Sequence, residues 1–176
     1  ADHFLKEAGI APGDFCVGIN PGGNWDPKRW PAESWAATAD SLIRQFQAKV
    51  IITGDKKDIP LAHRIQSFMK EKAVIAAGAL TIKEFAALCQ RLQVFISADT
   101  GPLHIANAVG TKRIIALFGP THPRITGPVP SERVTIIQKK TDCPVPCYVV
   151  DCPDNQCMKS ITSDDVVREV LKIKTE

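Results

Sequence analysis

The stretch Gln93 to Ala108, which reads QVFISADTGPLHIANA, decides the fold. Its first apolar run, at residues 94–96, is rich in strand formers and too short for a helix, so it predicts a buried strand. The residues after Thr100 have apolar side chains at helical spacing, with Thr100 as N-cap and Pro102 in the first turn. A strand that runs directly into a helix leaves free N–H groups at its carboxyl end. Open α/β sheets bind anions and nucleotides there.

Three polar side chains of this stretch are candidates for a site at that point: Asp99, Thr100 and His104. Each also has a purely structural interpretation. Asp99 can close the turn, Thr100 can cap the helix, and His104 can be an ordinary polar residue of a first helical turn. Because the three occur together at the end of one strand, the sequence favours a binding site.

Short apolar runs alternate with amphipathic segments along the rest of the chain. Five further strands are expected, at residues 15–19, 50–53, 74–77, 113–118 and 134–137. Apolar residues between them recur at helical spacing, and Thr81 with Glu84 forms a capping box. A last helix is expected to begin near Thr162 and to bury Val166, Val167, Val170 and Leu171. This alternation predicts a doubly wound, Rossmann-like α/β domain with a parallel sheet.

The composition is that of an ordinary globular domain. The 176 residues are 44% apolar and 23% charged, and a chain of this length can bury a sizeable core. The net charge of +3 is too small to indicate a nucleic-acid partner, although it suits an anionic small molecule. No apolar run approaches the ~20 residues that span a bilayer, and the amino end lacks a signal-peptide layout. Because the chain begins with Ala1 rather than Met, we expect a domain of a longer protein.

The two common phosphate-binding fingerprints are absent. No G-x-G-x-x-G or P-loop sequence occurs, so a redox dinucleotide or a nucleoside triphosphate is not expected. A glycine-rich loop at residues 20–24 instead follows the first strand and leads to Lys28 and Arg29. Two cations and backbone N–H groups suit a diphosphate. Lys28 considered alone could equally be a surface lysine.

Four cysteines cluster late in the chain, with the spacing C-x₃-C-x₄-C-x₄-C: Cys143, Cys147, Cys152 and Cys157. This spacing is not the paired C-x₂-C of common zinc sites. Reduced thiols are favoured, and one or two disulfides or a metal site remain as alternatives. We therefore expect no metal at the main site and regard these four residues as the only metal-ligand candidates.

Several segments carry a resemblance to a known family, in order and over nearly the whole chain. They are Asn-Pro-Gly-Gly at 20–23, Lys-Arg-Trp-Pro at 28–31, residues 54–58, Ser-Ala-Asp-Thr-Gly-Pro-Leu-His-Ile-Ala at 97–106 and Leu-Phe-Gly-Pro-Thr at 117–121. The chain resembles glycosyltransferase family 9, the lipopolysaccharide heptosyltransferases. The match is to the second half of a two-domain GT-B enzyme. It implies that residues 1–176 form one nucleotide-sugar binding domain and that the amino-terminal acceptor domain, with the catalytic base, is absent.

The resemblance implies a donor site for ADP-heptose and assigns its phosphate contacts. Lys28 would hold the donor phosphates. Thr100 and Gly101 would bond to the diphosphate, and His104 would lie against it. Such groups stabilise the charge that develops on a leaving diphosphate without having to reorganise, so no cofactor is required.

The resemblance also assigns the rest of the donor. Asp58 would bind the ribose, Leu80 would lie beside the adenine, and Asp99 would face the sugar. No catalytic residue is assigned in this chain, because deprotonation of the acceptor hydroxyl needs a base from the missing half. The isolated chain is accordingly expected to be inactive in transfer.

For the full-length protein, the family implies sugar transfer in lipopolysaccharide core synthesis. The partners would be the nucleotide-sugar and, through the missing domain, a lipopolysaccharide-core acceptor, with no nucleic acid. The location would be cytoplasmic, at the inner face of the inner membrane, with peripheral membrane association. Two alternatives remain: another GT-B enzyme that uses a UDP-sugar, and a nucleotide-binding module without catalysis. The sequence identifies neither the acceptor sugar nor the donor sugar.

Overall fold

The sheet predicted from the sequence forms the centre of the molecule. The computed structural model describes residues 1–175 and contains a six-stranded, all-parallel sheet with the order β3-β2-β1-β4-β5-β6. Its strands are β1 (Cys16–Asn20), β2 (Lys49–Ile52), β3 (Val74–Ile75), β4 (Val94–Ala98), β5 (Ile114–Phe118) and β6 (Val134–Gln138). The doubly wound prediction is therefore confirmed. The third strand is shorter than the predicted 74–77, because the chain turns there through Gly78, whose φ is +73°.

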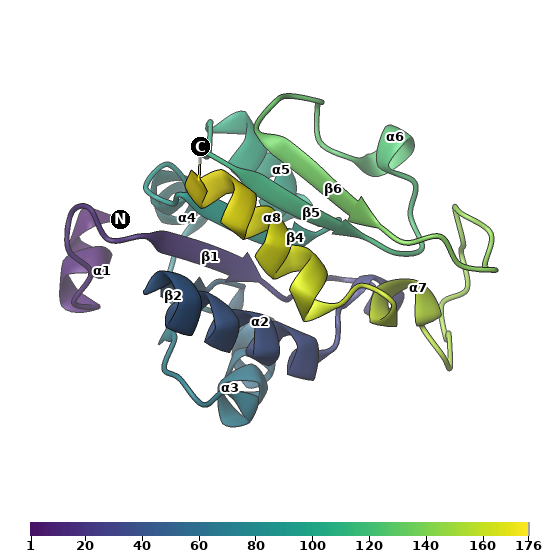
Figure 1. The fold of residues 1–176 in the computed structure, drawn as a ribbon, viewed down its shortest axis with the longest axis horizontal. Coiled ribbons are helices and arrows are strands. Elements are labelled where there is room, and N and C mark those ends of the chain that lie inside the picture. Colours follow the sequence, from purple (N-terminus) through teal and green to yellow (C-terminus); the bar gives the residue numbers. More distant parts are fainter. Residues whose placement is uncertain (176) are drawn as a thin grey trace.

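Helices connect the strands and cover the sheet (Figure 1). They are α1 (Asp2–Glu7), α2 (Ala32–Phe46), α3 (Ile59–Phe68), α4 (Ile82–Cys89), α5 (Gly101–Ala108), α6 (Pro123–Thr126), α7 (Gln156–Lys159) and α8 (Ser163–Thr175). Two 3₁₀ turns, η1 (Asp26–Lys28) and η2 (Lys56–Asp58), follow β1 and β2. The sequence did not reveal α6, α7 or the 3₁₀ turns, because segments of three or four residues are too short to show helical spacing.

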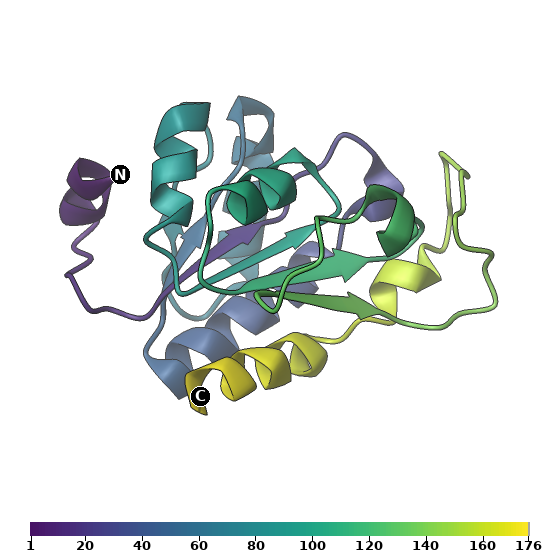
Figure 2. The same ribbon diagram turned by 90° about the horizontal axis from the view of Figure 1, so that it is seen from above.

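The two faces of the sheet have separate cores. Helices α2, α3 and α8 pack on one face, and α4 and α5 pack on the other (Figure 2). Neighbouring residues of one strand point to opposite faces, as Phe95 and Ile96 show. Because both faces are covered, the strands read as continuous apolar runs rather than alternating ones.

One predicted core residue of α8 lies at the surface. Val166, Val167 and Val170 are buried as expected, but Leu171 is 48% exposed. Leu171 lies about 100° around the helix from Val170, away from the buried stripe. The stripe continues instead at Ile173, which packs against the core.

The strand order reverses between β1 and β4. Their paired registers end at Asn20 and Ser97, and the loops that follow lead to helices on opposite faces of the sheet. This divergence opens a crevice at the carboxyl ends of these strands. Figure 1 shows α1 at the opposite edge, and the long segment after β6 extending past the carboxyl edge.

An ion pair joins the start of α8 to the end of β6. The Asp165 carboxylate accepts hydrogen bonds from Lys139 Nζ at 2.6 Å and from the Thr162 backbone N–H and hydroxyl at 2.9 and 2.8 Å. Burial acts to raise the pKa of Asp165, but these hydrogen bonds outweigh it and lower the pKa to about 2. The charged form is therefore favoured by folding.

Replacing this carboxylate should remove a pH-dependent part of the stability. A folded-state pKa below the unfolded value stabilises the fold above about pH 4, and this contribution is lost as the pH falls through about 2. Asp165→Asn should lower the free energy of unfolding at pH 7 by about 2 kcal/mol and flatten its decline between pH 4 and pH 2. Urea unfolding at several pH values measures both effects. The exposed neighbour gives the control, Asp164→Asn, and an equal loss in that variant would contradict the assignment.

Candidate functional site

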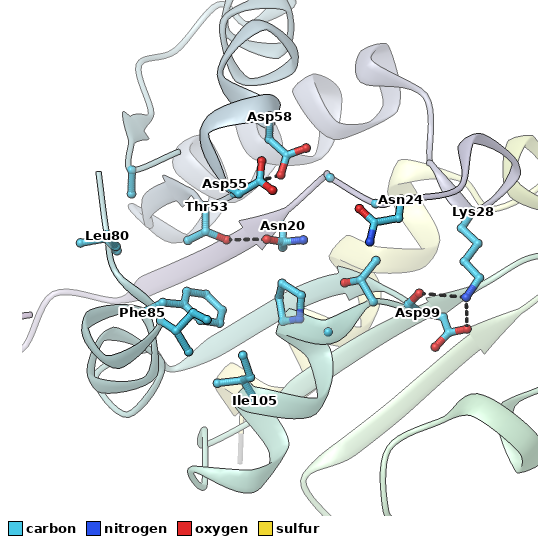
Figure 3. A pocket seen from close by; sticks show the side chains of 18 of the residues that line it. Asn20, Asn24, Lys28, Thr53, Asp55, Asp58, Leu80, Phe85, Asp99 and Ile105 are labelled. Carbon is cyan, nitrogen blue, oxygen red and sulfur yellow. Dashed lines mark hydrogen bonds and ion pairs between the residues drawn. The ribbon is translucent and has the colours of Figure 1, made fainter. Parts of the chain in front are cut away.

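A cavity of about 490 Å³ lies at the carboxyl ends of β1, β2 and β4 (Figure 3). Its size is within the usual range for small-molecule sites. Six of the seven residues predicted for the site line it: Lys28, Asp58, Leu80, Asp99, Thr100 and Gly101. The seventh, His104, is not among the lining residues. Its side chain is 47% exposed, and its Nε2 lies 3.9 Å from Asp99 Oδ1.

Apolar and charged groups occupy different ends of the cavity. Figure 3 shows Leu80 and Phe85 at one end and the Lys28–Asp99 pair at the other, with Asn20 and Thr53 between them. The Thr53 hydroxyl donates to the Asn20 side-chain oxygen at 3.1 Å. An occupant with a flat apolar part and an anionic part would match this arrangement.

Lys28 and Asp99 form an ion pair across the crevice. Lys28 Nζ lies 2.7 Å from Asp99 Oδ2 and 3.3 Å from the Asp99 carbonyl oxygen. The Asp99 side chain is only 4% exposed, whereas that of Lys28 is 22% exposed. The Thr126 hydroxyl donates to the same Oδ2 at 2.8 Å. Thr126 belongs to α6 and is 27 residues from Asp99 in the sequence. No local sequence pattern therefore predicted this contact.

The amino end of α5 points into the crevice. Thr100 occupies the N-cap position as predicted, but its side chain does not cap the helix. Its hydroxyl lies 3.3 Å from the Ala98 carbonyl oxygen and 3.1 Å from the Ser97 hydroxyl. Among the described residues, no side chain caps the amino end of α5 with a hydrogen bond. The free backbone N–H groups and the positive end of the helix dipole therefore favour an anion beside Gly101.

Two glycines allow Asp58 to lie against the glycine-rich loop. A Cβ at Gly22 would collide with the Asp58 carboxylate, and one at Gly54 would lie 2.6 Å from Asp58 Cβ. The carboxylate also accepts the backbone N–H of Asp55 at 3.0 Å. Asp58 is thereby fixed between the loops that follow β1 and β2.

The expectation of two phosphate-binding cations is wrong for Arg29. Its Nε and Nη2 donate to the Gly23 carbonyl at 3.0 and 2.6 Å, and its Nη1 pairs with Asp26 at 2.7 Å. Arg29 thus braces the glycine-rich loop from outside the cavity. Among the described residues that line the cavity, Lys28 is the one Lys or Arg side chain.

Within residues 1–175, no group of three or more His, Cys, Asp or Glu side chains has an arrangement that could hold a metal ion. All six cysteines are free thiols. Burial raises the pKa of Cys157, and the neighbouring Cys143 and Cys152 act in the same direction. No described helix is long and apolar enough to cross a bilayer.

The chain matches the model of a known protein family. Residues 5–157 fit the family model described as "Glycosyltransferase family 9 (heptosyltransferase)". The chain is 28% identical over 169 residues to lipooligosaccharide heptosyltransferase 2 of Campylobacter jejuni serotype O:6, covering 93% of this chain and 52% of that protein. It is 36% identical over 140 residues to the Haemophilus influenzae protein of the same name, covering 77% and 40%. The chain spans about half the length of the curated relatives it matches.

Solved structures show the same fold. The family 9 glycosyl transferase of Veillonella parvula superposes with a TM-score of 0.85 at 23% identity, covering 98% of this chain and 50% of that one. For E. coli ADP-heptose lps heptosyltransferase II the TM-score is 0.82 at 22% identity, with the same coverage. E. coli heptosyltransferase WaaC, solved with ADP, gives 0.70 at 19% identity and covers 98% and 48%.

Proposed function

The chain belongs to glycosyltransferase family 9, and from this we propose that it is the donor-binding part of an inverting heptosyltransferase that uses ADP-heptose. The observation that carries the proposal is the cavity at the crevice between β1 and β4. It combines an apolar end, a lysine and an uncapped helix terminus. A nucleoside diphosphate has the same two parts, a flat base and an anionic diphosphate.

The diphosphate would lie between Lys28 and the amino end of α5. A lysine ammonium has three N–H donors, so Lys28 can bond to a phosphate oxygen while it stays paired with Asp99. Gly101 and the Thr100 hydroxyl would supply the contacts from the helix side. These donors are held in place before the ligand arrives, as stabilisation of a leaving diphosphate requires.

The nucleoside would lie toward the apolar end. The Asp58 carboxylate, fixed by Gly22 and Gly54, would accept the ribose hydroxyls. Leu80 would pack against the adenine, in a cavity end that Phe85 and Ile105 also line.

The sugar would lie near Asp99. This carboxylate is buried and already accepts hydrogen bonds from Lys28 and Thr126, so it is a poor general base for an acceptor hydroxyl. We assign it to the donor sugar or to holding Lys28 in place. His104, outside the cavity, would act through Asp99 or touch the donor only at its edge.

The acceptor side would come from residues beyond this chain. The matched relatives are about twice as long, which leaves room for an acceptor domain that supplies the base. In the relatives named as heptosyltransferases, the product belongs to lipopolysaccharide or lipooligosaccharide. A lipopolysaccharide-core acceptor at the cytoplasmic face of the inner membrane, with peripheral membrane association, completes the proposal. These names do not favour a UDP-sugar enzyme or a non-catalytic module.

The 176 residues alone should bind donor without transferring sugar. A GT-B enzyme excludes water and completes its site by closing one domain over the other, which half of the fold cannot do. Incubation with ADP-heptose and a lipopolysaccharide-core acceptor should give no glycosylated product by mass spectrometry, and at most slow donor hydrolysis. Efficient transfer by this chain would mean that the base lies within it.

Removing Lys28 should weaken ADP binding in calorimetric titrations. Lys28→Ala deletes a charged hydrogen bond worth about 1.5–3 kcal/mol, or roughly 10–100-fold in affinity. Lys112→Ala is the matched control, because Lys112 is exposed just before β5, at the amino edge of the sheet. Lys112→Ala should bind ADP like the unchanged protein.

A second pair of variants distinguishes loss of a direct contact between Lys28 and the ADP phosphates from loss of the Lys28–Asp99 ion pair. Lys28→Ala also leaves the buried Asp99 carboxylate without its cation, which can disturb the crevice indirectly. The same lysine replacement should therefore be tested in the background of Asp99→Asn. A loss of affinity that persists there supports direct contact, and a loss that disappears there contradicts it.

A further inference from the structure

One buried side chain in the main cavity keeps free hydrogen-bond donors. Asn20 is the last residue of β1 and lines the cavity, although only 2% of its surface is exposed. Its side-chain oxygen accepts the Thr53 hydroxyl at 3.1 Å. Among residues 1–175, its side-chain nitrogen Nδ2 has no hydrogen-bond partner. Because buried polar groups in native proteins are normally hydrogen-bonded, this nitrogen indicates a partner that enters the cavity.

The polar residues at the neighbouring strand ends differ from Asn20 in this respect. Thr53, directly after β2, and Ser97, in β4, are also buried. The Thr53 hydroxyl bonds to Asn20, and the Ser97 hydroxyl lies 2.9 Å from the Ala98 carbonyl oxygen and 3.1 Å from the Thr100 hydroxyl. Both hydroxyls are therefore satisfied within the protein, whereas Asn20 Nδ2 has two N–H donors to offer.

The Thr53 hydroxyl decides which end of the Asn20 amide faces the cavity. This hydroxyl lies 3.1 Å from Asn20 Oδ1 and also 3.1 Å from the Ile19 carbonyl oxygen. The Ile19 carbonyl already accepts the Thr53 backbone N–H at 2.8 Å. A hydroxyl has one proton to donate, and donating it to Oδ1 turns Nδ2 to the opposite side. Figure 3 shows Nδ2 directed away from Thr53, toward Asn24.

Asn20 lies between the two ends of the cavity. Leu80 and Phe85 line the apolar end, and Lys28 lies at the charged end (Figure 3). A nucleoside diphosphate that spans the cavity places its ribose and its first phosphate between these ends. The Asp58 carboxylate can only accept hydrogen bonds and suits the ribose hydroxyls. The N–H donors of Asn20 suit an anionic phosphate oxygen.

We propose that Asn20 binds the α-phosphate of the donor, the phosphate that carries the nucleoside, and that Thr53 is the positioning residue that orients its amide. This inference rests on the proposed function, which places a nucleoside diphosphate in the cavity. It adds an uncharged group to Lys28 and the amino end of α5 as a third contact with the diphosphate. AMP has the α-phosphate as well and makes the same contact, whereas adenosine has no phosphate and does not.

Binding titrations with ADP, AMP and adenosine test the phosphate contact. Asn20→Leu removes the N–H donors at similar volume and adds no charge, while the Thr53 hydroxyl keeps the Ile19 carbonyl as acceptor. ADP and AMP should each bind at least about 10-fold more weakly, as loss of a hydrogen bond to a charged group implies, and adenosine should change by less than about 2-fold. Asn107→Leu is the matched control and should leave all three affinities unchanged, because the Asn107 amide donates to the Val129 carbonyl outside the cavity.

The results separate this contact from the wider assignment of the cavity. If the unchanged protein binds ADP and Asn20→Leu binds ADP and AMP equally well, the phosphate contact is overturned and the donor site stands. An equal loss of affinity for adenosine would also overturn it, because Asn20 would then contact the nucleoside. Failure of the unchanged protein to bind ADP would contradict the proposed function and this inference with it.

A second set of variants tests the positioning role of Thr53. Thr53→Val removes the proton that orients the amide, so AMP should bind about 3-fold or more weakly, and Thr53→Ser, which keeps the hydroxyl, should bind AMP normally. In the background of Asn20→Leu, Thr53→Val should have no further effect. The same loss in both backgrounds, or an equal loss in Thr53→Ser, would show that Thr53 does not act through the amide.

A last measurement uses the unchanged protein, so it does not depend on a variant that folds. The NMR signal of the Asn20 side-chain amide should shift when AMP is added and should stay in place when adenosine is added. Equal shifts with both compounds, or no shift when AMP is bound, would overturn the contact.

Discussion

The parallel pairing of β1 with β4 is the constraint on which the site depends. These two strands are adjacent in the sheet although about 75 residues separate them, and their last paired positions are Asn20 and Ser97. The chain leaves β1 toward one face and β4 toward the other, so the loops at their carboxyl ends separate. The glycine-rich loop and the amino end of α5 therefore face each other across a cavity rather than filling it.

Charge within that cavity is arranged before any ligand binds. Asp99 is almost completely buried, and Lys28 and Thr126 satisfy its oxygen. A buried carboxylate without such partners would be costly, so the pair fixes Lys28 at the rim of the crevice. Arg29 fixes the other side of the same turn through the Gly23 carbonyl. Within residues 1–175, Lys28 is thus the one Lys or Arg side chain that lines the cavity, and the amino end of α5 supplies the rest of the attraction for an anion.

Local patterns predicted much of this structure, and contacts distant in sequence account for what they missed. Strand-forming runs and helical spacing located the sheet and the longer helices, and Thr81 and Glu84 form the predicted capping box. The spacing of residues in the sequence could not show that the Thr126 hydroxyl bonds to Asp99 or that the Arg29 guanidinium bonds to the Gly23 carbonyl. The exposure of Leu171 depends on the rotation of α8 against the sheet. Spacing likewise could not show that the four clustered cysteines line one small cavity, which depends on the fold.

The most direct test of the central claim is a calorimetric titration of this chain with ADP, UDP and GDP. If the cavity is a donor site for an adenine nucleotide, ADP should bind one-to-one and at least about 10-fold more tightly than UDP or GDP, a difference of about 1.4 kcal/mol. The absence of saturable ADP binding would contradict the assignment of the cavity. Equal or tighter binding of UDP would contradict the assignment of the donor.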